Sequence, residues 1–508
     1  MSTELQHSVA GHHLPPELWL TVFFLTKNWD DSDWDVDAPS FTWPPNSVAT
    51  PEQCPLLLGR VCREWRNLSI SCGSLWTLVE YNITENSISR GGLEGLEQFL
   101  SRSGSLPICL IIETHLSDPE RINPFMELYY RHFHRVKFLR LSLGGGILEQ
   151  GVSVIPFPRN QLPVCRIIDT SFRFEDYSRW LAPVFAGDLP ALRALRMQEF
   201  VHHFESQDSR MPVAQHLQNL IFLDAVANNF DIRPVDVLQR CTNVRHFTMY
   251  FRLFGAQWGE GMDISDVAPF VVPNLQSLSL RAAFHGLWRD VLAPATCPAL
   301  EELTMIGRVW QLSPVLPFLE RSQCPLRKLN LSGSNVPTAD LLQVLHLVTG
   351  TLERLQLSRL YGSQKADDRD GFNDNILDLM DPQLHGTNVL LPRLDYLELE
   401  AINPSTAADG RFVEVVRART TTSNTVPFKH ITLVSYDVDS FASPGFHMLD
   451  FSGIVQLAME DKQLSLVINP NLWTARSRLA DLTSDEHRLC GARMFYRLNQ
   501  RPERLDRQ

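Results

Sequence analysis

Several common patterns are missing from this sequence of 508 residues. None of its nine cysteines forms a CxxC pair, so they fit no zinc template, and a scattered odd number is typical of reduced thiols inside a cell. No stretch is long and apolar enough to span a bilayer. Residues 18–25 match the length of a signal-peptide core, but Glu4 and Glu17 precede them and no Lys or Arg does. We therefore expect an intracellular protein, in the cytoplasm, the nucleus or both.

Basic residues are also scarce, with 46 Lys and Arg against 58 Asp and Glu, and the net charge of −12 argues against a nucleic-acid partner. The motifs of common enzymes are absent too: there is no GxSxG elbow, no HExxH and no P-loop. The glycines at 91–92 and 144–146 lack the spacing of a dinucleotide site. We expect no enzymatic activity, cofactor, metal or membrane contact, which leaves binding to other proteins.

What the sequence does contain is a repeat. From residue 136 onward, a short unit recurs in which an apolar residue is followed by others at positions +3 and +5, counted from the first. The units are VKFLRL (136–141), VCRIID (164–169), LRALRM (192–197), LQNLIF (217–222), VRHFTM (244–249), LQSLSL (275–280), LEELTM (300–305), LRKLNL (326–331), LERLQL (352–357), LDYLEL (394–399) and FKHITL (428–433).

Most units start 25–31 residues apart, and short helical patterns such as 233–241 and 339–348 lie between them. Prolines stand one or two positions ahead of several units. A strand, a helix and a return at this period resemble leucine-rich repeats, although the family's Asn or Cys after the LxL is mostly absent. The resemblance implies an α/β solenoid over residues 90–470, with a curved parallel sheet and outer helices.

Three segments do not follow the repeat. Residues 26–53 form an acidic loop whose centre, 28–47, holds five Asp, three Trp and three Pro without an apolar period, so we expect it to be dispensable for folding. Residues 361–392 insert a polar loop, in which Ala366 and Leu377 would occupy ligand positions of a calcium loop, which excludes that site. Residues 474–508 carry eight Arg against five acidic residues and are expected to form a charged cap or tail.

Two helical stretches flank the acidic loop, LPPELWLTVFFL (14–25) and CPLLLGRVCREWRNLSISCGSLW (54–76). On the first, Leu18, Val22 and Leu25 form one apolar stripe at helical spacing, and Trp19 and Phe23 form a second beside it. A domain of this size cannot bury both stripes internally. Part of the apolar surface is therefore expected to await a partner.

The same stretches resemble the F-box motif. The matching residues are Leu14-Pro15-x-Glu17, Val22-Phe23, Val61-Cys62-x-x-Trp65-Arg66 and Leu75-Trp76, with the acidic insertion as a departure from the usual pattern. The resemblance implies a small helical domain, residues 1–80, that docks on a Skp-type adaptor and through it on a cullin scaffold. The residues expected to bind the adaptor are Leu14, Pro15, Glu17, Leu18, Val22, Phe23, Leu57, Val61, Cys62 and Trp65.

Two functions fit these patterns. The chain is either the substrate receptor of an SCF-type ubiquitin ligase, or a leucine-rich repeat scaffold or sensor whose first helices serve only as a cap. In either case positions +2, +4 and +6 should face away from the core. Along the repeats these include Arg140, Arg196, His246, Tyr250, Arg281, Glu302, Lys328, Arg354, Tyr396, Glu398 and Glu400.

We take Arg196, His246, Tyr250, Arg281, Lys328, Arg354 and Tyr396 as candidates for substrate binding. The stretch from 281 to 354 is mainly basic, whereas 396–400 is acidic apart from its tyrosine. Such a basic stripe would select an acidic or phosphorylated segment. The alternative is that these are ordinary solvated side chains.

Overall fold

The structure is a computed structural model, and the chain divides into two compact units: residues 1–232 with 240–244, and residues 233–239 with 245–508. The residues that the structure describes are 14–25, 36–37, 55–84, 90–114, 116, 118–143, 162–170, 185, 187–197, 214–227, 233–251, 267–282, 286–307, 312–332, 336–358, 372, 374–400, 411–434, 456–458 and 463–468.

The first unit begins with three short helices and continues with six parallel strands, β1 to β6, which lie in the sheet in sequence order. Its elements are α1 (Pro16–Leu25), α2 (Pro55–Val61), α3 (Arg63–Ser71), η3 (Gly73–Trp76), β1 (Leu78–Ile83), α4 (Arg90–Arg102), β2 (Ile108–Thr114), α5 (Pro119–Tyr130), η4 (Phe133–Arg135), β3 (Val136–Leu143), β4 (Ile167–Thr170), β5 (Ala194–Met197), α7 (Ala214–Leu217) and β6 (Phe222–Ala227).

The second unit carries eight parallel strands in the order β7-β9-β11-β12-β13-β14-β15-β16, and a separate parallel pair, β8 and β10. Its elements are α8 (Pro234–Arg240), β7 (His246–Phe251), β8 (Phe270–Val271), β9 (Ser277–Ala282), α9 (Gly286–Leu292), β10 (Ala295–Thr296), β11 (Glu302–Gly307), α10 (Leu312–Ser322), β12 (Lys328–Ser332), α11 (Thr338–Leu347), β13 (Arg354–Ser358), α12 (Asp374–Leu379), α13 (Pro382–His385), η5 (Gly386–Asn388), β14 (Tyr396–Glu400), α14 (Arg411–Thr421), β15 (His430–Val434) and β16 (Ser465–Ile468).

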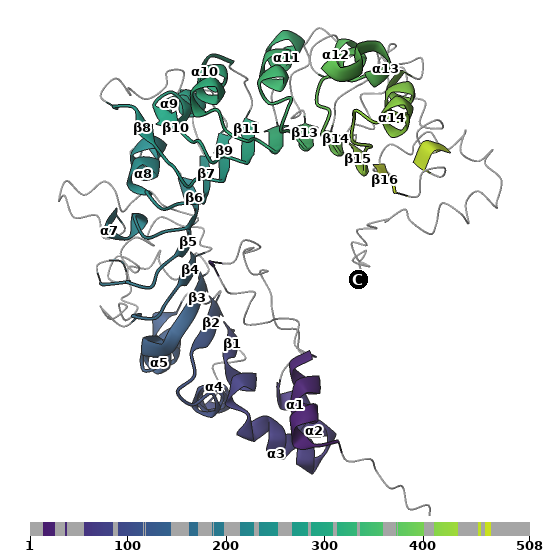
Figure 1. The fold of residues 1–508 in the computed structure, drawn as a ribbon. Helices are drawn as coiled ribbons and strands as arrows, with labels where there is room; N and C mark the ends of the chain where they lie inside the picture. Colours follow the sequence, from purple (N-terminus) through teal and green to yellow (C-terminus); the bar gives the residue numbers. More distant parts are fainter. Residues whose placement is uncertain are drawn as a thin grey trace, which may run out of the picture. The chain divides into compact units, whose positions relative to one another are not determined.

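The leucines of the repeat explain the register of the second sheet. Leu278, Leu303, Leu329, Leu355 and Leu397 stand opposite one another on neighbouring strands, and all are buried. The residues between them alternate with these buried positions, as in β7 and β9. Helices follow the strands on one side of the sheet in Figure 1. The predicted parallel sheet with one strand per repeat is confirmed, and the arrangement is like that of a leucine-rich repeat solenoid.

In the first sheet, two of the predicted units start at a different residue from the one that the sequence indicated. Ala194 pairs with Phe222, so the unit begins at Leu220 and not at 217, and Ile167 pairs with Ala194, so the unit at 164 begins at Cys165. The apolar runs at these places contain several residues that could start a unit. The sheet also begins earlier than residue 90, because β1 and β2 precede β3 and pair with each other.

Several expectations fall outside the described residues. These are the tail 474–508, the acidic loop apart from residues 36–37, and most of the first part of the insertion 361–392. The later part of that insertion forms α12, α13 and η5. No helix in the described part of the chain has the length and apolarity to cross a membrane.

Candidate protein-binding surfaces

The helices α1, α2 and α3 enclose an aromatic core. The ring centroid of Trp65 lies 4.7 Å from that of Trp19 and 4.9 Å from that of Phe23. The Trp76 indole donates a hydrogen bond of 2.7 Å to the Ser69 carbonyl oxygen and is 1% exposed. The tryptophan of the Val61-Cys62-x-x-Trp65 stretch therefore packs in a core, and the face of α1 that carries Trp19 and Phe23 is the one that turns inward.

Local hydrogen bonds fix the start of α3 and its angle to α2. The Cys62 thiol accepts a hydrogen bond of 3.4 Å from the Trp65 amide, as an N-cap side chain does. The Arg66 guanidinium donates to the Gly59 carbonyl oxygen of α2 at 2.8 Å. The cysteine and the arginine of the motif thus have structural roles that its spacing did not reveal.

A second set of apolar side chains in this region is exposed. Leu18 and Val22, on one side of α1, are 49% and 36% exposed, and Leu14 just before the helix is 38% exposed. Leu56 and Val61 on α2 are 50% and 61% exposed. We call these five residues, which lie on or next to two short helices, the apolar stripe. Such a concentration of exposed aliphatic side chains on short helices is typical of a contact site.

The residues expected to bind an adaptor divide between core and surface. Leu14, Pro15, Glu17, Leu18, Val22, Val61 and Cys62 are exposed, and Leu57 and Trp65 are half-buried. Phe23 differs from the expectation, because it is 1% exposed and packs with Leu75 and Trp76. Leu56 was missed, since the run of three leucines at 56–58 hides which one faces outward.

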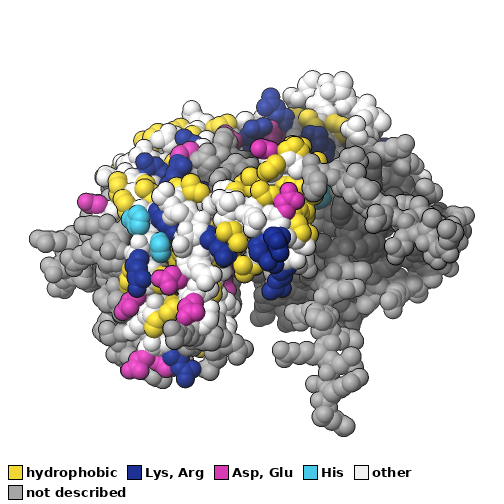
Figure 2. Space-filling view, turned by 90° about the horizontal axis from the view of Figure 1, so that it is seen from below, with side chains coloured by type: hydrophobic (Ala, Val, Ile, Leu, Met, Phe, Trp, Pro, Cys, Tyr) yellow, Lys and Arg dark blue, Asp and Glu magenta, His cyan; other side chains and the backbone are white. Residues whose placement is uncertain are grey.

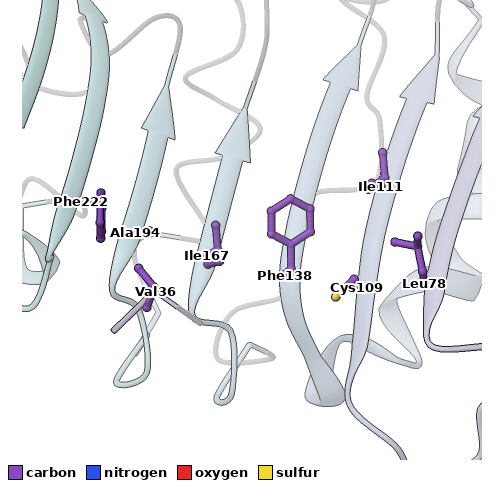
Figure 3. Packing of buried hydrophobic residues seen from close by; sticks show 8 residues of the cluster. All are labelled: Val36, Leu78, Cys109, Ile111, Phe138, Ile167, Ala194 and Phe222. Atoms are coloured by element: carbon purple, nitrogen blue, oxygen red, sulfur yellow. The ribbon is translucent and has the colours of Figure 1, made fainter. Parts of the chain in front are cut away.

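The six strands of the first unit present a buried apolar row at position +2 of their units. Its members are Leu78, Cys109, Phe138, Ile167, Ala194 and Phe222. We call the side of each sheet that carries positions +2 and +4 the inner face. Val36, from the acidic loop, belongs to this cluster and is 1% exposed (Figure 3). The acidic loop, which we expect to be dispensable for folding, thus contributes one packed residue that a lone valine between two aspartates did not signal.

Position +4 of the four strands β3 to β6 carries alternating charges. The Arg140 guanidinium donates to a carboxylate oxygen of Asp169 at 2.8 Å, and Arg196 lies 3.8 Å from that oxygen and 2.8 Å from a carboxylate oxygen of Asp224. Arg140 and Asp169 are 2% and 1% exposed, so Arg140 is not the solvated side chain that its position predicted. Burial raises the pKa of the Asp169 carboxyl, against the opposing effect of Arg140 and Arg196.

In the second unit the inner face is polar, and much of it pairs internally. Lys328 forms an ion pair with Glu302 on the neighbouring strand. The Gln356 amide accepts a hydrogen bond from Asn330 at 2.8 Å and donates one to Glu398 at 3.2 Å. Because these partners occupy the same position on adjacent strands, the repeat itself brings them together.

Three planar side chains stack at the far end of this face. Arg354 lies over the Tyr396 ring at 5.5 Å, and the Tyr396 and His430 rings are stacked with centroids 4.6 Å apart. The Tyr396 hydroxyl donates to Glu398 at 2.7 Å, and burial together with this bond raises the pKa of Tyr396 to about 12. Burial lowers the pKa of His430.

The predicted basic stripe is interrupted. Lys328 is compensated by Glu302, whereas Arg281 and Arg354 are exposed on strands β9 and β13. His246 and Tyr250 are half-buried, and burial lowers the pKa of His246. The side chain of Glu400 is not among those that the structure describes. Basic and acidic side chains are likewise interspersed on the face shown in Figure 2.

The described residues hold no group of three His, Cys, Asp or Glu side chains that could bind a metal ion. No protein-family model matches the chain, and no curated protein matches it. Among solved structures, it is similar to a chain in the crystal structure of the TLR13–ssRNA13 complex, with 14% sequence identity and a TM-score of 0.27. That match covers 78% of this chain and 62% of the other, so this chain spans less than two thirds of its length.

Proposed function

We propose that this chain is the substrate receptor of a cullin–RING ubiquitin ligase of the SCF type. In this role the helices α1–α3 dock on a Skp-type adaptor, and the inner faces of the repeats bind a protein substrate. The observation that supports the proposal is the division of the motif residues into a packed aromatic core and the apolar stripe. The chain contributes binding surfaces in this role and needs no catalytic group of its own.

The division matters because a docking module needs a core that keeps its helices folded and also exposed apolar side chains that contact the partner. Phe23, Trp65 and Trp76 hold the helices together without a partner, since their rings pack on one another and on Leu75. Leu18 and Val22 then remain partly exposed, and a partner that covers them would gain roughly 25 cal/mol for each Å² of apolar area removed from water. An amphipathic helix that offers such residues at i and i+4 fits a hydrophobic groove on another protein.

A second candidate, a repeat scaffold whose first helices serve as a cap, is favoured by a different contact. Trp76 packs edge-on against Phe99 of α4 at 4.7 Å, and Arg102 lies over the same indole at 4.5 Å. The helices are thereby joined to the first repeats of their unit. A cap needs this joint, whereas it does not need the apolar stripe, so the stripe is what the experiment should change.

The test is capture of a purified Skp-type adaptor by the full-length chain. The double variant Leu18→Asp with Val22→Asp should lose capture, because two carboxylates would be buried in an apolar contact. The matched control is Ile70→Asp on α3, a residue that is 42% exposed and lies outside the stripe, and it should capture the adaptor as the wild type does. If the double variant melts cooperatively and still captures the adaptor, the receptor proposal fails and the scaffold remains.

A further inference from the structure

The residue Val36 is buried on the inner face of the first unit. It lies outside every strand, yet it belongs to the same cluster as Ile167 and Ala194, the +2 residues of two neighbouring strands (Figure 3). The +2 residues of the second unit include Glu302, Lys328 and Arg354, which are charged, whereas those of the first unit are apolar. The apolar row is thus a local feature that suits an apolar side chain from outside the sheet.

Basic residues along the edge of the row are opposite in charge to the acidic segment that carries Val36. Asp37 forms an ion pair with Arg166, the residue just before β4. The Arg166 amide donates to the Lys137 carbonyl oxygen at 2.8 Å, and the Arg193 amide donates to the Arg166 carbonyl oxygen at 2.8 Å. Three basic residues at position +1 of consecutive units are therefore neighbours along the edge of the apolar row.

We propose that the inner face of the first unit is a binding site for an acidic segment in which an apolar residue is followed by Asp or Glu. The residues Val36 and Asp37 occupy the site in cis, and a partner protein binds by replacing them. Ile167 and Ala194 accept the apolar side chain, and Lys137, Arg166 and Arg193 attract the acidic ones. The inference deepens the substrate-binding half of the proposed function and does not depend on the adaptor half.

Exchange requires the partner to replace one buried side chain, Val36, and one exposed ion pair. The side chains of Asp37 and Arg166 are 51% and 38% exposed, and an ion pair exposed to this degree stabilises little. Attachment to the chain favours Val36 and Asp37 by raising their effective concentration at the site. A partner must therefore exceed that local concentration or carry more acidic residues, and removal of the internal occupant should strengthen its binding.

The test measures binding of a labelled peptide with the sequence of residues 33–40, DWDVDAPS, to full-length proteins by fluorescence anisotropy. Val36→Asp places a charge on the apolar row, and Asp37→Arg sets a cation against Arg166, so each variant should vacate the site. Either variant should bind the peptide at least tenfold more tightly than the wild type, whose site is filled. Arg166→Glu added to Val36→Asp should remove the gain, whereas Arg131→Glu, on a residue with a 66% exposed side chain, should not.

Asp37 is exposed, so the Asp37→Arg variant keeps the test valid even if Val36→Asp fails to fold. The proposal is overturned if neither variant gains affinity for the peptide, or if the gain survives Arg166→Glu. A peptide with Asp in place of Val36 should not bind, and its binding would also overturn the proposal. Adaptor capture by the same proteins is scored separately, so that loss of one activity is not taken for loss of the other.

Discussion

At the scale of single residues, the charges at position +4 of the first sheet show how a repeat can bury polar groups. Arg140 and Asp169 are paired residues on the neighbouring strands β3 and β4, and their opposite charges compensate each other in an ion pair. A sequence shows that both residues stand at position +4. It does not show that the two side chains will be buried there.

This pair gives a prediction on stability. Asp169→Leu leaves the Arg140 charge buried without its partner and should lower the free energy of unfolding by about 3–5 kcal/mol. The double variant Arg140→Met with Asp169→Leu should recover at least half of the loss, since both charges are then gone. The matched control Asp224→Leu should cost far less, because its partner Arg196 has a 24% exposed side chain. Urea unfolding monitors all three, and a double variant as unstable as Asp169→Leu would refute the explanation.

His132 gives a prediction on pH. Its Nδ1 lies 3.1 Å from the Arg135 guanidinium, which can only donate, so the ring is held neutral, and burial together with Arg135 lowers the pKa of His132 to about 4. In the unfolded chain the pKa is about 6.5. The unfolded state therefore binds the proton more readily, and the stability that His132 contributes above pH 6.5 is lost as the pH falls toward 4.

The measurement is the free energy of unfolding between pH 4 and pH 7. His132→Gln should show a shallower loss of stability on acidification than the wild type, because its side chain does not titrate. Identical slopes for His132→Gln and the wild type would contradict the assignment.

At the scale of elements, strands β7, β9 and β11 to β15 were predictable because each carries the alternation of a sheet with one buried side, whereas the two-residue strands β8 and β10 carry none. In β2, by contrast, the first five residues are all buried, and such a run has no alternation to mark its register. The motif helices were predictable from their periodicity, but not which of their apolar residues form the core. Phe23 and Val22 are adjacent in sequence, and only packing against Trp65 and Trp76 decides that Phe23 is inside.

The end of β11 offers a test of packing between a strand and the helix before it. A Cβ atom at Gly307 would lie 2.5 Å from the Trp288 ring of α9 and 2.6 Å from the Ala282 carbonyl oxygen. Gly307→Ala should therefore lower the free energy of unfolding by about 1–3 kcal/mol. At Gly350 a Cβ atom meets nothing within 4 Å, and Gly350→Ala should change stability by less than about 0.5 kcal/mol. Equal thermal stability of the two variants would disprove the contact.

At the scale of the whole molecule, the two units combine one architecture with two kinds of inner face. In the first unit the inner face is apolar at position +2, and its charged residues at position +4 form ion pairs with one another. Val36 of the acidic loop packs on this face. In the second unit the face is polar and carries the exposed cations Arg281 and Arg354. The net charge of −12 gave no indication of this division, because it averages over surfaces that would meet different partners.

The central claim, that the first helices dock on a Skp-type adaptor, is tested most directly by calorimetric titration of the full-length chain with that adaptor. We expect saturable 1:1 binding with a Kd below about 1 μM, which corresponds to more than about 8 kcal/mol of binding free energy. Leu18→Asp with Val22→Asp should abolish the heat of binding, and Ile70→Asp should retain it. A folded wild-type chain that gives no binding heat with the adaptor and does not co-elute with it would contradict the claim.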